Sequence, residues 1–180
     1  MEIFNQILFW INWVITTLCS LAFGIQLLYV LLFWLPSKKY KPAKVKHRVG
    51  IIIPARNEAS VIGDTVKCLL NSDYPRELYD IFVVADNCTD NTAEIARNAG
   101  AIVFEHFDDN PKHKRAGYAL QYGFEQILAD YDNYEFFIKF DADNLMEPNY
   151  ISKMNDAFDA GVQCARGYSN SKNISENVVS

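Results

Sequence analysis

The sequence of 180 residues lacks the short motifs that mark several large enzyme classes. It contains no GxGxxG turn after an apolar run, so the usual phosphate turn of a nicotinamide- or flavin-binding fold is missing. It contains no GxxxxGK(S/T), which excludes a P-loop as far as a motif can, and no GxSxG, which removes the common hydrolase elbow. Any ligand of this chain must therefore be held by other residues.

The sequence also has little cysteine and no excess of positive charge. Its four cysteines show no CxxC spacing, and Cys19 lies in a long apolar stretch. Disulfides and a zinc site are not expected, in agreement with a reducing compartment. The formal net charge of −5 argues against a nucleic-acid partner.

Charge is missing altogether from the 29 residues at 7–35. A helix of that length is about 43 Å long, whereas the hydrocarbon core of a membrane is about 30 Å thick. Aromatic residues near both ends suit the two membrane interfaces. A secretory signal peptide is the alternative, but it would have a basic start and a shorter apolar core. We predict a single transmembrane helix over residues 1–35.

The charge changes sign near residue 48. Residues 1–48 contain six basic residues and one acidic residue, whereas residues 49–180 contain 11 basic and 21 acidic residues. Such a change marks a boundary, so residues 36–48 are predicted to be a basic juxtamembrane linker. Because basic residues beside a span stay in the cytoplasm and attract anionic headgroups, we expect the N-terminus outside and the rest of the chain inside. A linker that only adds solubility is the alternative.

From residue 49 onward, short apolar runs alternate with helical stripes. The runs predict strands at 49–53, 81–85, 101–104 and 136–140, and the start of a fifth at 163–166. The stripes predict helices at 60–70, from Thr89 or Asp90 to 98, at 115–129, and from Pro148 to about 159. Strands that alternate with helices indicate an α/β fold with a doubly wound, mostly parallel sheet.

Polar residues follow three of the predicted strands. Residues 56–58 (RNE) follow the first, residues 86–87 (DN) the second, and residues 141–144 (DADN) the fourth. In such sheets ligands bind beyond the carboxyl ends of the strands. Asp141 and Asp143 would point to one side of extended backbone, where they suit Mg²⁺ or Mn²⁺ with phosphate oxygens as further ligands. A turn that caps the next helix is the alternative.

A polar loop is predicted at 105–114, before a helix. Lys114 and Arg115, at the helix start, can approach a diphosphate, and an ordinary exposed loop is the equally weighted alternative. His106 and His113 lie in the same loop. We expect both to be solvated rather than catalytic.

Four segments together resemble the family 2 glycosyltransferases. They are IIIPARNE (51–58), VVADNCTDNT (83–92), KRAGYAL (114–120) and FDADNLMEPNYI (140–151), in the family's order and rough spacing. The resemblance covers residues 49 to about 173. It implies an inverting enzyme of the GT-A fold, anchored in a membrane, with a Rossmann-like half that binds a nucleotide-sugar, typically a UDP-sugar.

The resemblance also implies roles for single residues. Asp86 matches the acid that hydrogen-bonds the nucleobase, although Ala85 replaces the acid that often precedes it. Gly117 matches a glycine in the loop over the diphosphate, where Ala116 separates it from the basic residue. The implied metal ligands are Asp143, the more direct one, and Asp141. The implied nucleotide-sugar-binding residues are Pro54, Ala55, Arg56, Asn57, Glu58, Asp86, Lys114, Arg115, Gly117, Asp141 and Ala142.

The resemblance leaves the general base unassigned. In similar proteins the base is an acid on a later segment, so we expect it beyond Ser180 and expect residues 49–180 to be the donor-binding part of a longer enzyme. The acceptor would be the hydroxyl of a glycan or of a lipid-linked sugar. Two alternatives remain, namely a non-catalytic membrane-anchored module that binds nucleotide-sugars and, ranked lower, a sugar nucleotidyltransferase, which usually has a Gly-rich loop after its first strand.

Overall fold

The computed structural model describes the chain except for residues 34–38, 111–112, 114, 132 and 168–180. The chain divides into two units, Met1–Lys39 and Tyr40–Ser180.

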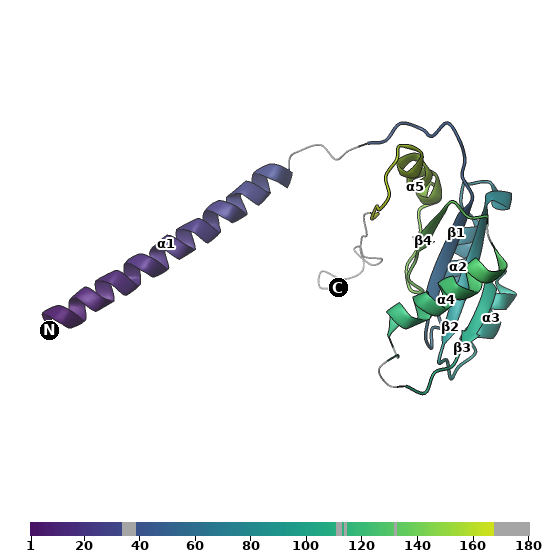
Figure 1. Ribbon diagram of the computed structural model, residues 1–180, viewed down its shortest axis with the longest axis horizontal. Helices are drawn as coiled ribbons and strands as arrows, with labels where there is room; N and C mark the ends of the chain where they lie inside the picture. Colours follow the sequence, from purple (N-terminus) through teal and green to yellow (C-terminus); the bar gives the residue numbers. More distant parts are fainter. Residues whose placement is uncertain (34–38, 111–112, 114, 132, 168–180) are drawn as a thin grey trace. The chain divides into compact units, whose positions relative to one another are not determined.

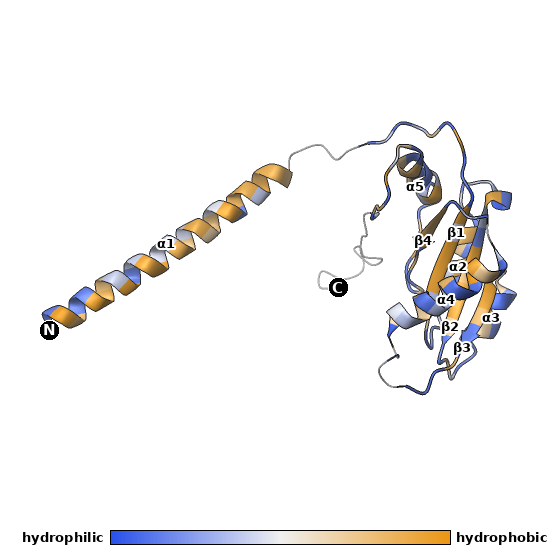
Figure 2. Cartoon of the chain, in the orientation of Figure 1, coloured by the Kyte–Doolittle hydropathy of each residue, from blue (hydrophilic) through white to orange (hydrophobic). Residues whose placement is uncertain are grey.

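The first unit contains one long helix, α1, at Glu2–Phe33. Its side chains are exposed along its whole length, and most of them are apolar (Figure 2). The helix is long and apolar enough to cross a membrane, which are also properties of a signal sequence near an N-terminus. The prediction of a span therefore stands on length and composition, and its orientation stays a prediction.

The second unit contains a four-stranded parallel sheet in the order β3-β2-β1-β4 (Figure 1). The predicted α/β fold with a doubly wound parallel sheet is confirmed. The strands are β1 (Val49–Ala55), β2 (Tyr79–Asp86), β3 (Ile102–His106) and β4 (Phe136–Lys139). The helices are α2 (Ile62–Leu70), the short 3₁₀ helix η1 (Arg76–Leu78), α3 (Thr92–Asn98), α4 (Ala116–Asp130) and α5 (Tyr150–Asp159).

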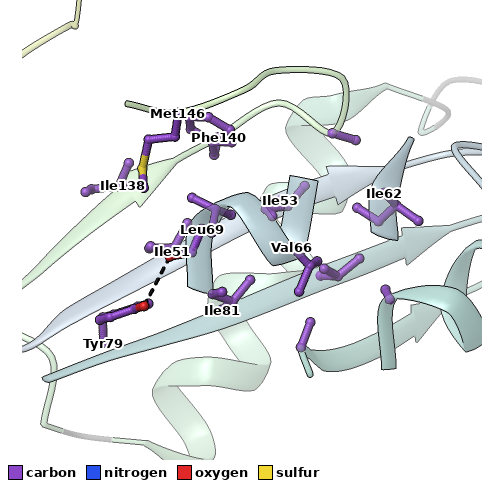
Figure 3. Close-up of a cluster of buried hydrophobic side chains, with 14 of the residues drawn as sticks. Ile51, Ile53, Ile62, Val66, Leu69, Tyr79, Ile81, Ile138, Phe140 and Met146 are labelled. Carbon is purple, nitrogen blue, oxygen red and sulfur yellow. Dashed lines mark hydrogen bonds between the residues drawn. The ribbon is translucent and has the colours of Figure 1, made fainter. Parts of the chain in front are cut away.

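Helices cover both faces of the sheet because successive side chains of a strand point to opposite faces. Ile51 and Ile53 of β1 join a cluster with residues of α2, α3 and α5, and Figure 3 shows part of it. Ile52, between them, joins a second cluster with β2 and α4 on the other face. The uninterrupted apolar run of β1 is thus explained by burial on both sides.

Gly123 allows α4 to approach the sheet closely. A Cβ atom at this position would lie 2.6 Å from Cγ2 of Val84 and 2.8 Å from Cδ1 of Ile52. A larger residue here would require the side chains of Val84 and Ile52, or the helix itself, to shift. The position of α4 matters because its first turn borders the pocket described below.

The predicted fifth strand at residues 163–166 is wrong, because the structure describes this segment without strand structure. Helix α5 ends in a turn at Gly161, whose φ is +84°, and the Val162 N–H donates to the carbonyl of Ala157. Residues 163–166 then lie exposed. Gln163 and Arg166 give this segment little apolar surface to bury, and no described strand pairs with it.

The segment before β1 lies along α5 and is hydrogen-bonded to it. The backbone N–H of Ala43 donates to Asp156 at 2.7 Å, and that of His47 donates to the buried Asn155 at 3.0 Å. The hydroxyl of Tyr74 donates to the carbonyl of His47 at 2.7 Å, and burial raises the pKa of Tyr74 to about 12. The last residues before the sheet are therefore held against α5 within the second unit.

Candidate functional site

The carboxyl ends of β1, β2 and β3 bring three chemically active residues together. Strand β1 ends at Ala55, which pairs with Ala85, and the last residue of β2, Asp86, pairs with His106 of β3. Arg56 follows directly on β1. The register of the sheet therefore places Arg56, Asp86 and His106 at one edge.

Asp86 is at the centre of this group. Its side chain is only 5% exposed and accepts a hydrogen bond from Arg56 Nη2 at 2.9 Å. It also contacts His106 Nδ1 at 2.8 Å and accepts from Asn87 Nδ2 at 2.8 Å. Arg56 Nε donates to the Asp86 carbonyl at 3.1 Å, so the guanidinium holds both the main chain and the side chain of Asp86. Charged donors of this kind form strong hydrogen bonds and satisfy a carboxylate that is buried away from water.

The loops after β1 and β2 are joined to each other. Asn57 adopts φ of +55°, a left-handed conformation that asparagine tolerates better than most residues. Its side-chain oxygen accepts the Thr89 N–H at 2.8 Å, and the Thr92 hydroxyl accepts the Glu58 N–H at 2.8 Å. Asn57 thus acts in the structure by holding the loop of Arg56 and Glu58 against the following loop.

A pocket of about 210 Å³ opens at this edge. Five of the predicted nucleotide-binding residues line it, which are Pro54, Ala55, Arg56, Glu58 and Asp86. Ala116 and Ala119 of α4 complete the lining. Neither alanine is among the predicted site residues, although their place in the first turns of the helix after the polar loop could have indicated them.

The remaining predicted residues lie elsewhere. Arg115 is the exposed residue that precedes α4, and Gly117 lies exposed in its first turn with open space around it. Lys114 lies outside the described residues. Neither Arg115 nor Gly117 lines the pocket, so the structure places them next to the lining residue Ala116 without joining them to the cavity.

The segment of Asp141 and Asp143 follows β4 and is anchored at its middle residue. Ala142 is buried, and its carbonyl accepts the hydroxyl of Thr65 in α2 at 2.6 Å. Asp141 is 52% exposed and forms an ion pair with Lys139. Asp143 is exposed and has no hydrogen-bond or ion-pair partner in the described part of the chain. None of the three lines the pocket.

The sequence profile of Glycosyl transferase family 2 matches residues 50–178, well over half of the chain. The chain belongs to this family. The match includes the parallel sheet from the second residue of β1 onward, together with Asp86 and the segment of Asp141 and Asp143.

Curated relatives are similar over parts of their length. The low-salt glycan biosynthesis hexosyltransferase Agl6 of Haloferax volcanii is 36% identical over 83 residues, which are 46% of this chain and 19% of that protein. The uncharacterized protein MJ1222 of Methanocaldococcus jannaschii is 33% identical over 109 residues, 61% of this chain and 41% of that protein. The chain therefore spans less than half the length of these two relatives.

Solved structures share the fold at low identity. The mannosyltransferase PcManGT of Pyrobaculum calidifontis matches with a TM-score of 0.60 and 23% identity, over 78% of this chain and 41% of that one. Residues 1–349 of TarS from S. aureus match with a TM-score of 0.53 and 19% identity, over 69% of this chain and 39% of that one. These matches agree with the GT-A architecture of the second unit.

In this family 2 chain, the residues after β4 fit a hard divalent cation. Asp141 and Asp143 offer exposed carboxylate oxygens, the ligand type that Mg²⁺ and Mn²⁺ prefer. The described residues contain no group of three or more histidine, cysteine or acidic side chains that could hold a metal ion. Two protein carboxylates suit a cation that takes its other ligands from phosphate and water, as Mg²⁺ commonly does.

The expectation that His106 is a solvated loop residue is wrong. His106 is the last residue of β3, its side chain is only 17% exposed, and it contacts the carboxylate of Asp86. Its ring also packs on Tyr122 of α4, with centroids 4.4 Å apart. The error arose because β3 extends two residues beyond the apolar run 101–104, into residues that read as loop in the sequence.

Proposed function

We propose that the second unit binds a nucleotide-sugar donor for an inverting glycosyltransferase, with UDP as the nucleotide. The observation that carries this proposal is the pocket lined by Arg56, Glu58 and Asp86 in a chain of glycosyl transferase family 2. The mannosyltransferase with which the chain shares its fold was solved with GDP-Man and Mn²⁺. A nucleotide-sugar and a divalent cation are the two ligands that the acidic strand ends of this chain would need.

In this proposal the nucleobase lies against Asp86, whose carboxylate accepts a ring N–H. Arg56 fixes that carboxylate, and Glu58, which lines the same pocket, accepts hydroxyl groups of the ribose. Pro54 and Ala55 form the floor, where small side chains leave room for the nucleoside. Asn57 acts indirectly by holding the loop, as its bonds to Thr89 indicate.

The diphosphate would lie between α4 and the residues that follow β4. The first N–H groups of a helix attract anions, which gives Gly117 and the open space around it a role in admitting a phosphate. Arg115 and Lys114 would add positive charge, while Asp141 and Asp143 would hold Mg²⁺ or Mn²⁺ and Ala142 would pack beneath the diphosphate. A bound divalent cation acts as a Lewis acid that stabilises the departing diphosphate.

The transfer step itself needs groups that we do not assign within the described residues. The acceptor hydroxyl of a glycan or lipid-linked sugar attacks the anomeric carbon from the face opposite the diphosphate, which inverts that carbon. The C–O bond to the diphosphate breaks, and the proton of the hydroxyl passes to a general base. Transfer is therefore a property we propose for the whole enzyme of which this donor site is a part.

Helix α1 would anchor this site to a membrane. We propose that it spans the bilayer once, with the N-terminus outside and the family 2 domain in the cytoplasm, because the basic residues follow the helix. Labelling of the exposed Cys164 in sealed cells tests this orientation, since a thiol reagent that cannot cross membranes should not reach a cytoplasmic residue. Labelling without permeabilisation would contradict it.

Titration calorimetry of the full chain in detergent micelles tests donor binding. UDP should bind more tightly with Mn²⁺ than with a chelator, and ADP should bind more weakly than UDP under both conditions. A chain that gives no binding heat with UDP and Mn²⁺ would contradict the proposed function. Equal affinities with and without Mn²⁺ would contradict the metal site alone.

A further inference from the structure

Two histidines lie in matched arrangements along the same helix. His106 Nδ1 contacts Asp86 at 2.8 Å and its ring packs on Tyr122, while His113 Nδ1 contacts Asp108 at 2.6 Å and its ring stacks on Tyr118. Both ring pairs have centroids 4.4 Å apart. The two tyrosines are one helical turn apart on α4. Of the two acids, Asp86 lines the proposed nucleotide pocket, whereas Asp108, the partner of His113, is not among its lining residues.

The hydrogen bonds of Asp86 leave one position for a ligand. A carboxylate offers about four acceptor positions, two on each oxygen. His106 Nδ1 and Asn87 Nδ2 both lie on Oδ1, and Arg56 Nη2 lies on Oδ2. Within the described residues, therefore, the position that remains is on Oδ2, and Asp86 lines the pocket.

The donor identities follow from the neighbouring contacts. An ionised carboxylate only accepts, so His106 must carry its proton on Nδ1 in this contact. The Asn87 side-chain oxygen accepts the Asp108 N–H at 3.0 Å, which leaves its amide nitrogen as the donor to Asp86. The packing on Tyr122 fixes the plane of the His106 ring, and the Tyr122 hydroxyl donates to the carbonyl of Glu105 at 3.4 Å.

We infer that His106 is a positioning residue for base recognition: it holds Oδ1 of Asp86 so that the open position on Oδ2 meets a ring N–H of the nucleobase. This inference rests on the proposed function. A fixed acceptor suits uracil, which carries hydrogen on N3, and guanine, which carries hydrogen on N1. The same acceptor disfavours the binding of cytosine, because N3 of cytosine is itself an acceptor. His106 therefore contributes to discrimination between UDP and CDP.

Calorimetry of the full chain in micelles with Mn²⁺ tests this role through the ratio of the CDP and UDP dissociation constants. His106→Ala should weaken UDP binding by about tenfold, leave CDP binding almost unchanged and move the ratio toward one. His106→Asn places an amide nitrogen near the position of Nδ1 and should retain most of the discrimination. His113→Ala is the matched control, because it removes the equivalent ring without touching Asp86, and it should keep the wild-type ratio.

The outcomes separate this inference from the proposed function. An unchanged ratio in His106→Ala, or an equal loss in His106→Asn or His113→Ala, would overturn the role of His106 while UDP binding by the wild type still stands. Thermal unfolding of each variant identifies general destabilisation, which would weaken UDP and CDP binding alike and leave the ratio as it was. Failure of the wild-type chain to bind UDP would overturn the proposed function and this inference with it.

Discussion

Asp86 and Asp143 both follow strands of one parallel sheet, but their surroundings are opposite. Asp86 is buried and accepts from three side chains, from Arg56, Asn87 and His106. Asp143 is exposed and has no partner within the part of the chain that the structure describes. The first carboxylate is therefore fixed before any ligand arrives, whereas the second keeps its oxygens available.

The difference indicates that Asp86 contributes mainly to folding stability, whereas Asp143 is available to contribute to cation binding. A buried carboxylate with three donors contributes to the stability of the strand ends, and its removal leaves those donors without an acceptor. An exposed carboxylate contributes little to folding and can change partners when a cation binds. We therefore expect substitutions at the two positions to separate stability from metal-dependent binding.

Asp86→Ala should have the largest effect. Arg56, Asn87 and His106 would lose a shared acceptor, which should lower the free energy of unfolding of the second unit by about 2–4 kcal/mol. UDP binding should be lost as well. Chemical denaturation of the full chain in micelles measures the first effect. Asp64→Ala, at an exposed acid of α2, is the control and should change stability by less than about 0.5 kcal/mol. A stability equal to that of this control would show that the hydrogen bonds of Asp86 do not stabilise the fold.

Much of the structure around the buried Asp86 could be predicted from the sequence. The apolar runs predicted β1 and β2, and the ends of these runs placed Arg56 and Asp86 beside each other, since carboxyl ends of parallel strands meet at one edge. The length of β3 was not predictable, because its last residues, Glu105 and His106, are polar and are recruited by pairing with β2. The contact of His106 with Asp86 depends on that register.

The anchoring of the exposed segment of Asp141 and Asp143 could not be predicted in full from the sequence. The motif predicted that Asp141 and Asp143 lie together after a strand, but not that the hydroxyl of Thr65 anchors Ala142 between them. That contact joins residues 77 positions apart. Side-chain bonds of this kind have no local pattern in the sequence. The predicted fifth strand failed for another reason, since residues 163–166 lie exposed and pair with no described strand.

Asp143→Ala should have the second largest effect, and it should appear in binding rather than in stability. The affinity for UDP in Mn²⁺ should fall by about tenfold or more, equivalent to about 1.4 kcal/mol, to the value measured with a chelator. The free energy of unfolding should stay within about 0.5 kcal/mol of the wild type. Asp64→Ala again serves as the control for a lost surface charge. Retention of the Mn²⁺ effect in Asp143→Ala would remove this residue from the proposed metal site.

Thr65→Val should have a smaller effect on stability. Thr65 is itself buried, and it anchors the segment that carries the exposed Asp141 and Asp143. Valine keeps the shape of threonine but leaves the carbonyl of Ala142 without its 2.6 Å donor, which should cost about 1–2 kcal/mol of unfolding free energy. Ser152→Ala is the control, because the Ser152 hydroxyl donates to Asp73 at 2.8 Å at an exposed position. It should cost less than about 0.5 kcal/mol. Equal costs for the two variants would contradict the idea that burial of the bond, rather than its presence, stabilises the loop.

The smallest effect concerns pH and the cluster of His47, Glu135 and Asp159, in which Glu135 is about as exposed as Asp141. His47 lies between Glu135, at 2.7 Å and 51% exposed, and Asp159, at 3.3 Å. The hydrogen bond to Glu135 raises the pKa of His47, and the same bond lowers the pKa of Glu135. The pKa of Asp159 is lowered first by the N–H of Lys44 and then by His47.

The sign of the pH dependence follows from these directions. A raised histidine pKa stabilises the fold below its ordinary value of 6.5, and this contribution is lost as the pH rises through the raised value. A lowered carboxylate pKa stabilises the fold above the ordinary value of 4.5 for Glu135, and this contribution is lost as the pH falls through the lowered value. The cluster should therefore stabilise the second unit most between pH 4.5 and 6.5.

Denaturation of the wild type and of His47→Gln at about pH 5.5 and about pH 8.5 measures this contribution, because the other titrating groups are common to both proteins. The wild type should exceed the variant in stability by more at the lower pH. Because the carboxylates are exposed, salt near 1 M, where the Debye length is about 3 Å, should reduce that excess. An excess that grows at the higher pH would contradict a protonated His47, and an excess that ignores salt would indicate that the packing of His47 on Phe158 matters more than its charge.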